Sequence, residues 1–162
     1  PDAILPKLAA ASSAGDYLIL SANLAPGTDY RLGVQRVLPL YDNDLTKEWL
    51  LTFLLHLGVE RGDGKIAFEI ETSPSKRYLL RMAAYFTFNP ARTISVSGER
   101  FEFKSGERIR LFYSYRYTPQ RIEALLNQYQ FKLARSWITK SQEEGIFLCQ
   151  KDPTPAACST GG

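Results

Sequence analysis

The order of apolar and polar positions in the N-terminal part of the chain is typical of one half of an α/β unit. Apolar spacing predicts a helix over residues 3–14, which Gly15 ends. Residues 17–22 form an apolar run between turn residues, which predicts a strand buried on both faces. The loop at residues 25–29 follows this strand, and ligands of open α/β sheets lie near such strand ends.

Two helices are expected next. The first is short and covers residues 31–40. Asn43 or Asp44 then caps a stronger helix, and Gly58 suits its C-terminal end. Apolar residues recur along this second helix at a helical spacing. The stripe consists of Leu45, Trp49, Leu50, Phe53, Leu54 and Leu57.

From about residue 65 the apolar residues recur with a period of two, which predicts short antiparallel strands. These strands are expected over residues 66–71, 78–88, 93–96, 100–103 and 108–115. Residues 104–107, Lys-Ser-Gly-Glu, predict a hairpin turn between the last two of them. The strands form a second structural region.

A helix and a hairpin are expected at the end of the chain. Thr118 and Pro119 are typical of the first turn of a helix, with Thr118 as the cap. Strands are expected over residues 131–139 and 146–150, around a polar turn at residues 141–145. This order commonly closes an α/β sheet whose last strand is antiparallel.

The expected fold class is α/β, with a sheet that is interrupted by inserted helices and antiparallel strands. Residues 1–31 and 117–151 are assigned to an incomplete core, residues 32–116 to the insertion and residues 152–162 to a flexible tail. The chain begins without a methionine, and the strand at residues 17–22 would have an exposed edge. We therefore expect a missing N-terminal half, and we expect the isolated chain to pair with it or to self-associate.

Composition argues against several classes of partner. The 162 residues are 44% hydrophobic and 23% charged, as in ordinary soluble domains. The net charge is only +3, and Arg108 and Arg110 alternate with apolar residues, so a nucleic-acid partner is not expected. No segment reaches the ~20 apolar residues of a membrane span and no signal peptide is visible, so a cytoplasmic location is expected.

Metal binding and nucleophilic catalysis have little support. Cys149 and Cys158 lack a metal-ligand spacing, and His56, the single histidine, lies in an apolar helical run. No metal site is expected. A hydrolase would need a nucleophile–base pair, and the sequence offers none.

The most specific motif is the stretch from Gly106 to Pro119, GERIRLFYSYRYTP. It resembles the pattern G-E-x-I-R-T-E-x-S-x-K-Y-T of the histidine-specific, S-adenosylmethionine (SAM)-dependent methyltransferases. The stretch Tyr41-Asp42-Asn43 is similar to an Ala-Tyr-Asp stretch of that family. The closing strands fit through Phe131, Trp137 and Phe147. The resemblance covers residues 1–150 and implies the C-terminal half of a Rossmann-like class I methyltransferase, with residues 32–116 as its substrate-recognition region.

The resemblance implies four substrate-binding residues. Tyr41 matches a tyrosine that helps to hold the substrate carboxylate, and Ser114 matches a serine that engages the imidazole of histidine. Phe112 stands where the family has a glutamate, two residues before Ser114, so both share one face of a strand. Leu80 falls near a pocket methionine. The structural alternatives are a helix-end aromatic at Tyr41 and core packing at Phe112 and Leu80.

The departure from glutamate at Phe112 bears on the substrate. A carboxylate accepts hydrogen bonds from imidazole N–H groups, whereas a phenyl ring offers only an apolar surface. A site that loses a hydrogen-bonding partner loses much of its discrimination. We therefore expect N-methylation of an amino acid or related small amine that is less polar than histidine.

The cofactor that the resemblance implies is SAM, but no glycine-rich loop of the dinucleotide-binding kind follows a strand here. The main SAM contacts are expected upstream, and the chain alone is expected to be inactive. No residue is assigned as a general base, so no catalytic residue is assigned. The alternative is a non-catalytic small-molecule-binding or interaction module built on the aromatic-rich β region.

Overall fold

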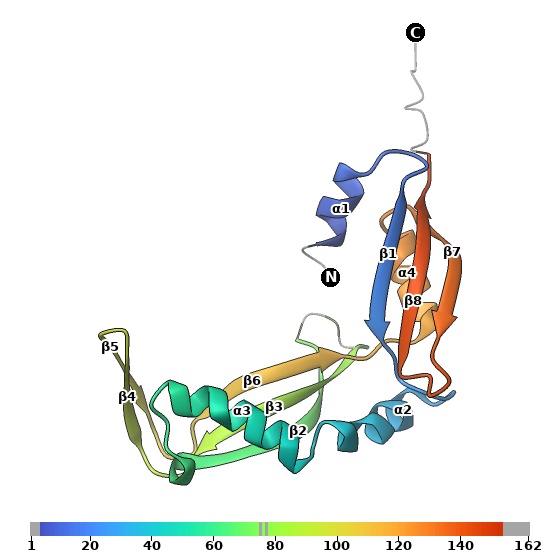
Figure 1. Cartoon of the computed structure of the whole chain (residues 1–162). Coiled ribbons are helices and arrows are strands. Elements are labelled where there is room, and N and C mark those ends of the chain that lie inside the picture. Colours follow the sequence, from blue (N-terminus) through green and yellow to red (C-terminus); the bar gives the residue numbers. More distant parts are fainter. Residues whose placement is uncertain (1–3, 75, 77, 154–162) are drawn as a thin grey trace. The chain divides into compact units, whose positions relative to one another are not determined.

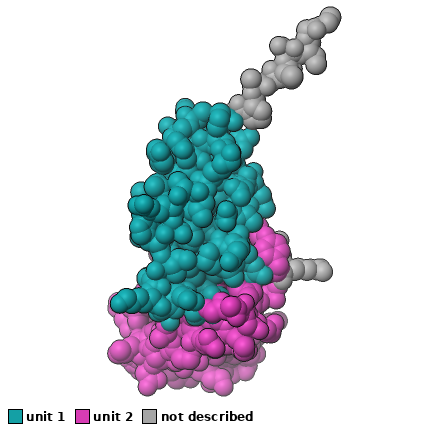
Figure 2. All heavy atoms as spheres, turned by 90° about the vertical axis from the view of Figure 1, so that its right-hand side faces the viewer, with its two compact units in different colours: residues 1–26, 117–162 teal, residues 27–116 magenta. Residues whose placement is uncertain are grey.

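The chain divides into two units, each with its own sheet and core. The computed structural model describes residues 4–153, except residues 75 and 77. Unit 1 comprises residues 1–26 and 117–162, and unit 2 comprises residues 27–116 (Figure 2). The described fold contains both helices and strands, so it is mixed α/β, and all the strand pairs within its sheets are antiparallel. Cys158 and most of the expected tail at residues 152–162 lie outside the described residues.

Unit 1 is a sheet with helices on one face (Figure 1). The strands lie in the order β1-β8-β7. Its elements are α1 (Leu5–Ala11), β1 (Tyr17–Asn23), α4 (Pro119–Asn127), β7 (Phe131–Ile138) and β8 (Glu144–Lys151). Leu5 of α1 and Leu126 of α4 pack in one core cluster with Phe147 and Cys149 of β8. Both helices therefore cover the same side of the sheet.

Strand β1 is covered on one face only, within the described residues. Leu18 and Leu20 pack against the helix-side core, whereas Tyr17 is 65% exposed and Ile19 is 70% exposed. The expectation of a strand buried on both faces is wrong for the described residues, because α1 and α4 lie on the same side. Successive side chains of a strand point to opposite faces, so every second residue of β1 is left outside.

Unit 2 contains a three-stranded sheet, a two-stranded sheet and two α-helices (Figure 1). The larger sheet has the strand order β2-β3-β6, and β4 pairs with β5. The helices are α2 (Tyr30–Val37) and α3 (Asp44–His56), with 3₁₀ turns at Leu38–Leu40 and Arg61–Asp63. The strands are β2 (Gly64–Thr72), β3 (Leu80–Phe88), β4 (Arg92–Val96), β5 (Glu99–Phe103) and β6 (Arg108–Tyr115).

Helix α3 covers one face of the larger sheet. Its cap is Asn43, one of the two predicted residues, and Asn43 Oδ1 accepts a hydrogen bond of 3.0 Å from the backbone N–H of Thr46. Leu50 and Leu54 are buried in the clusters beneath the helix. The rest of the predicted stripe is not all buried. Leu45 is 86%, Trp49 67% and Phe53 60% exposed. The apolar surface of α3 is therefore wider than the face that packs on the sheet.

The expected hairpin between residues 100–103 and 108–115 is wrong. Strand β5 pairs with β4, and β6 pairs with β3. The turn itself forms, since the N–H of Glu107 donates to the carbonyl of Lys104 at 3.0 Å. The N–H of Gly106, however, donates to the carbonyl of Phe88 at 2.7 Å, and that of Phe88 to Glu107 at 2.9 Å. These bonds direct the chain from the turn onto the end of β3.

The thiol of Cys149 should be unreactive in the folded protein. It is fully buried in the core of unit 1, and burial raises the pKa of this thiol. A raised pKa lowers the thiolate fraction at every pH below it, and the thiolate is the reactive form. Iodoacetamide labelling at pH 7 to 8, followed by peptide mass spectrometry, should modify Cys149 at least about tenfold more slowly in the native than in the urea-unfolded chain. Equal rates would contradict the described core.

Candidate functional site

Alternation along β6 and the residue that follows it places three side chains on the face that α3 covers. In the register with β3, Phe112 lies opposite Ala84 and Ser114 opposite Met82. Arg116 follows Ser114 by two residues, and its backbone N–H donates to the carbonyl of Leu80 at 3.1 Å, which continues the pairing. Alternate residues share a face, so Phe112, Ser114 and Arg116 lie on one side of the sheet.

Tyr41 reaches this face from the loop between α2 and α3. It ends the 3₁₀ turn Leu38–Leu40, where its N–H donates to the carbonyl of Leu38 at 2.9 Å. Its ring stacks on Phe112, with the centroids 5.6 Å apart and an angle of 25° between the planes. Phe112 also meets Phe68 of β2, at 6.4 Å between centroids. Phe112 therefore packs in the core and contacts Tyr41 at the same time.

Arg116 is a buried charged residue beside Tyr41. Its side chain is among the most enclosed in the chain, with 1% of the residue exposed. The Nη2 atom donates a hydrogen bond of 2.6 Å to Tyr41 Oη, and the guanidinium carbon lies 5.1 Å from the centroid of the Tyr41 ring. Guanidinium groups stay protonated in proteins, so a positive charge is held at this position.

Tyr30 fixes the backbone around the cluster. It starts α2, which Asp29 caps by accepting a 2.9 Å hydrogen bond from Leu32 N–H. Tyr30 Oη accepts a hydrogen bond from Leu80 N–H and donates one to the carbonyl of Arg116, both at 2.8 Å. One hydroxyl thus joins the start of β3 to the chain that leaves β6.

The four residues that the sequence resemblance singled out lie in unit 2, on one face of the larger sheet or in contact with it. Tyr41 and Phe112 touch, whereas Ser114 and Leu80 are each 8% exposed and lie further along β6 and at the start of β3. Sequence reasoning missed Arg116 and Tyr30. The period of two that paired Phe112 with Ser114 also points to Arg116, but no sequence signal marks Tyr30.

The opposite face of the same sheet is polar and aromatic. Arg81 Nε donates a 2.6 Å hydrogen bond to Glu71 Oε1, and Tyr85 Oη lies 3.1 Å from Glu71 Oε2. The Arg81 guanidinium lies 5.2 Å from the ring centroid of Tyr113. These groups satisfy one another, which is what a structural ion pair on a sheet surface requires.

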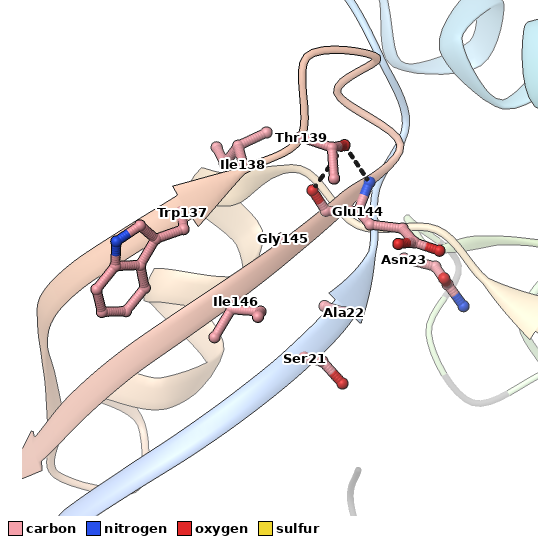
Figure 3. A pocket seen from close by; sticks show the side chains of 9 residues that line it. All are labelled: Ser21, Ala22, Asn23, Trp137, Ile138, Thr139, Glu144, Gly145 and Ile146. Atoms are coloured by element: carbon pink, nitrogen blue, oxygen red, sulfur yellow. Dashed lines mark hydrogen bonds between the residues drawn. The ribbon is translucent and has the colours of Figure 1, made fainter.

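A separate pocket of about 470 Å³ lies in unit 1 (Figure 3). Its walls come from the ends of β1, β7 and β8, and none of the four expected site residues lines it. Thr139 Oγ1 closes one end by donating to the carbonyl of Glu144 at 3.2 Å. Trp137 and Ile146 are 48% and 47% exposed there. The pocket is an apolar hollow on the outer face of the sheet.

Residues 4–153, except residues 75 and 77, contain no group of three or more His, Cys, Asp and Glu side chains that is arranged to hold a metal ion. None of the helices in this part of the chain is both long and apolar enough to cross a membrane.

The loop after β1 differs from a dinucleotide-binding loop in its glycine content. The loop after β1 holds a single glycine, Gly27. A dinucleotide-binding loop needs several glycines so that the backbone can approach the phosphates or ribose closely. No residue of this chain is therefore assigned to bind SAM.

Comparison with protein families places the chain in a class. The model of the family described as "Histidine-specific methyltransferase, SAM-dependent" matches residues 2–151. The chain therefore belongs to the family of histidine-specific, SAM-dependent methyltransferases. The cofactor of this class is S-adenosylmethionine, as expected from the sequence.

One solved structure is similar over most of the chain. It is an S-adenosylmethionine-dependent methyltransferase from Clostridium acetobutylicum ATCC 824, with 12% sequence identity and a TM-score of 0.38. The match covers 91% of this chain and 49% of that protein, so the chain spans about half of its length. A search of curated proteins found no significant match.

The double hydrogen bond of Tyr30 should stabilise unit 2 measurably. A Tyr30→Phe variant leaves two backbone groups, Leu80 N–H and the Arg116 carbonyl, without this partner. We expect the free energy of unfolding in urea to fall by about 1–3 kcal/mol. Tyr17→Phe, at a tyrosine that is 65% exposed, is the matched control and should leave stability unchanged. Equal effects of the two variants would mean that the Tyr30 bonds contribute nothing specific.

Proposed function

We propose that the chain is the C-terminal, substrate-recognising part of a SAM-dependent N-methyltransferase. Its substrate would be an amino acid or related small amine that is less polar than histidine. The single observation that supports this substrate class is the stack of Tyr41 on Phe112, because it places an aromatic ring, packed against a second one, where the family pattern has a glutamate.

The chemistry of that stack disfavours imidazole. A histidine side chain carries N–H and N: groups that lose hydrogen bonds with water when they enter a site. Phe112, which also packs on Phe68, can neither donate nor accept a conventional hydrogen bond. A polar ligand group that is buried without a hydrogen-bond partner loses ~1–3 kcal/mol of binding free energy. An apolar or aromatic ligand side chain instead gains binding free energy when it is buried against the Phe112 ring.

In this proposal the chain contributes orientation rather than proton transfer. Methyl transfer to nitrogen requires a neutral amine that is aligned with the methyl donor, and alignment alone supplies a large part of such catalysis. Tyr41 and Ser114 would position the substrate, and Leu80 and Phe112 would supply apolar contact. The SAM-binding residues would lie outside residues 1–162, so the chain alone would be inactive.

The function is tested by calorimetric titration of the full-length protein that contains this chain. SAM is titrated first, and histidine and phenylalanine are then titrated with S-adenosylhomocysteine present. We expect SAM to bind, and phenylalanine to bind more tightly than histidine. Failure of SAM to bind, with stoichiometric binding of a small molecule in its absence, would instead favour a non-catalytic binding module.

A Phe112→Glu variant should move the preference towards histidine. It restores a hydrogen-bond acceptor at the position where the family pattern has one. We expect the ratio of histidine to phenylalanine affinity to rise about tenfold or more, with some loss of stability because Phe112 packs on Phe68. Phe112→Leu, which keeps the wall apolar, is the control. An unchanged ratio in Phe112→Glu would argue that the side chain at 112 does not contact the substrate.

The proposal also concerns the open face of unit 1, which is the face of its sheet that α1 and α4 do not cover. Ile19, Trp137 and Ile146 are 70%, 48% and 47% exposed, and β1 lies at the edge of its sheet in the described chain. Exposed edges and apolar faces favour pairing with further chain. We propose that an upstream segment of the full-length protein covers this face, and that the isolated chain self-associates in its absence.

Sedimentation of residues 1–162 tests this association. We expect species larger than a monomer, and an Ile19→Lys variant should shift the chain towards monomer because it places a charge on the open face. Leu45→Lys, the same change at an 86% exposed leucine of α3, is the matched control and should not alter the distribution. A stable monomer, or equal effects of both variants, would contradict the proposed role of the β1 face.

A further inference from the structure

The hydrogen bond between Arg116 and Tyr41 has only one possible direction. A guanidinium group has five N–H donors and no acceptor, so in the 2.6 Å bond Nη2 donates and Tyr41 Oη accepts. The hydroxyl hydrogen of Tyr41 is then directed to some other acceptor. The Tyr41 hydroxyl can therefore donate a hydrogen bond to a ligand atom near Oη.

The charge of Arg116 favours an anion at that place. The residue is 1% exposed, so its field is weakly screened by water. Its Nη2 lies 2.6 Å from Tyr41 Oη, which places the positive charge next to the hydroxyl. A carboxylate near Tyr41 Oη is attracted by this charge, and an ammonium group is repelled. Donation to a charged acceptor is also stronger than donation to a neutral one.

The ring of Tyr41 has the opposite character. It stacks on Phe112 at 5.6 Å between centroids, so the side of the cluster away from Oη is apolar. A ligand that contacts both the Tyr41 hydroxyl and the stacked rings would place an anionic group at the hydroxyl and an apolar or aromatic group along the rings. Its amine would then lie away from Arg116.

The backbone of Arg116 is held in place independently of its side chain. Its carbonyl accepts from Tyr30 Oη at 2.8 Å, and its N–H donates to Leu80 at 3.1 Å. Both anchors belong to unit 2, and they keep the base of the side chain fixed relative to β3. The guanidinium is therefore preorganised for its bond to Tyr41.

The family resemblance implies that Tyr41 helps to hold the substrate carboxylate. We propose that Arg116 is a positioning residue for that carboxylate, acting through Tyr41, and that the substrate is therefore an α-amino acid with an aromatic or apolar side chain and not a simple amine. The inference rests on the proposed methyltransferase function and narrows it. It adds Arg116, two residues after Ser114 and just beyond the end of β6, to the residues that decide specificity.

The test compares L-phenylalanine with phenethylamine, which has the same ring and amine but no carboxylate. Both are titrated into the full-length protein by calorimetry with S-adenosylhomocysteine present. Wild type should prefer phenylalanine by roughly 10- to 100-fold, and Arg116→Gln should lose most of this preference. Arg116→Lys, which keeps the charge, should retain part of it. Phenethylamine affinity should stay within about twofold in all variants, because this ligand has no carboxylate for the pair to hold.

A double-mutant cycle separates positioning from mere structural support. If Arg116 acts through Tyr41, Tyr41→Phe should cause a loss similar to that of Arg116→Gln, and the double variant should lose little more. Arg110→Gln, at an exposed arginine on the other face of β6, is the control and should leave the preference unchanged. If Arg116→Gln does not fold, Tyr41→Phe alone still tests whether the preference depends on the hydroxyl.

Three results would overturn the inference. The first is equal binding of phenylalanine and phenethylamine by wild type. The second is a fall in affinity for both ligands alike in Arg116→Gln, and the third is additive losses in the double variant. In each case retained SAM binding and methyl transfer would leave the proposed function standing. Absence of SAM binding would remove the proposed function, and this inference with it.

Discussion

One extra residue in β6 determines which side chains of unit 2 can meet. Ala84 of β3 lies opposite Phe112, but the next residue, Tyr85, lies opposite Arg110, so Leu111 has no partner in the ladder. A bulge of this kind reverses the alternation beyond it. Without it, Arg110 would share a face with Phe112 and Ser114, beneath α3. With it, Arg110 lies on the outer face, and Arg116, just beyond the end of β6, holds its guanidinium beside Tyr41.

The local features of the fold could be predicted because they depend on neighbouring residues. The cap at Asn43 and the cap at Thr118, whose Oγ1 accepts from Arg121 N–H at 3.3 Å, are both confirmed. Their side chains bond to backbone groups three residues away, so the sequence alone contains the interaction. The pairing of β6 with β3 is instead extended by hydrogen bonds between the turn and Phe88, which is remote in sequence. The alternation of apolar and polar residues predicts a strand, but it does not show with which other strand it pairs.

The same distinction applies to the candidate site. Resemblance to a motif pointed to Tyr41 and Phe112, and the two rings do stack, although their positions are separated by most of unit 2. Arg116 could have been added from the period of two. Tyr30 could not, because its hydroxyl meets the backbone of Leu80 and Arg116, and backbone partners leave no mark in a sequence. Nor could the bulge be foreseen, since Leu111 is an ordinary strand residue.

The inner face of the larger sheet combines an aromatic wall at Phe112 with the buried charge of Arg116, just beyond the end of β6. These two requirements oppose each other for most ligands, because apolar molecules gain nothing from the guanidinium and small ions gain nothing from the rings. A molecule with an anionic end and an apolar end satisfies both, and in one orientation only. Methyl transfer depends above all on such orientation, so a site without an assigned general base can still be suited to this reaction. In the proposed function, the departure at Phe112 would change which side chain the site accepts, while the direction that Arg116 would impose on the ligand would stay the same.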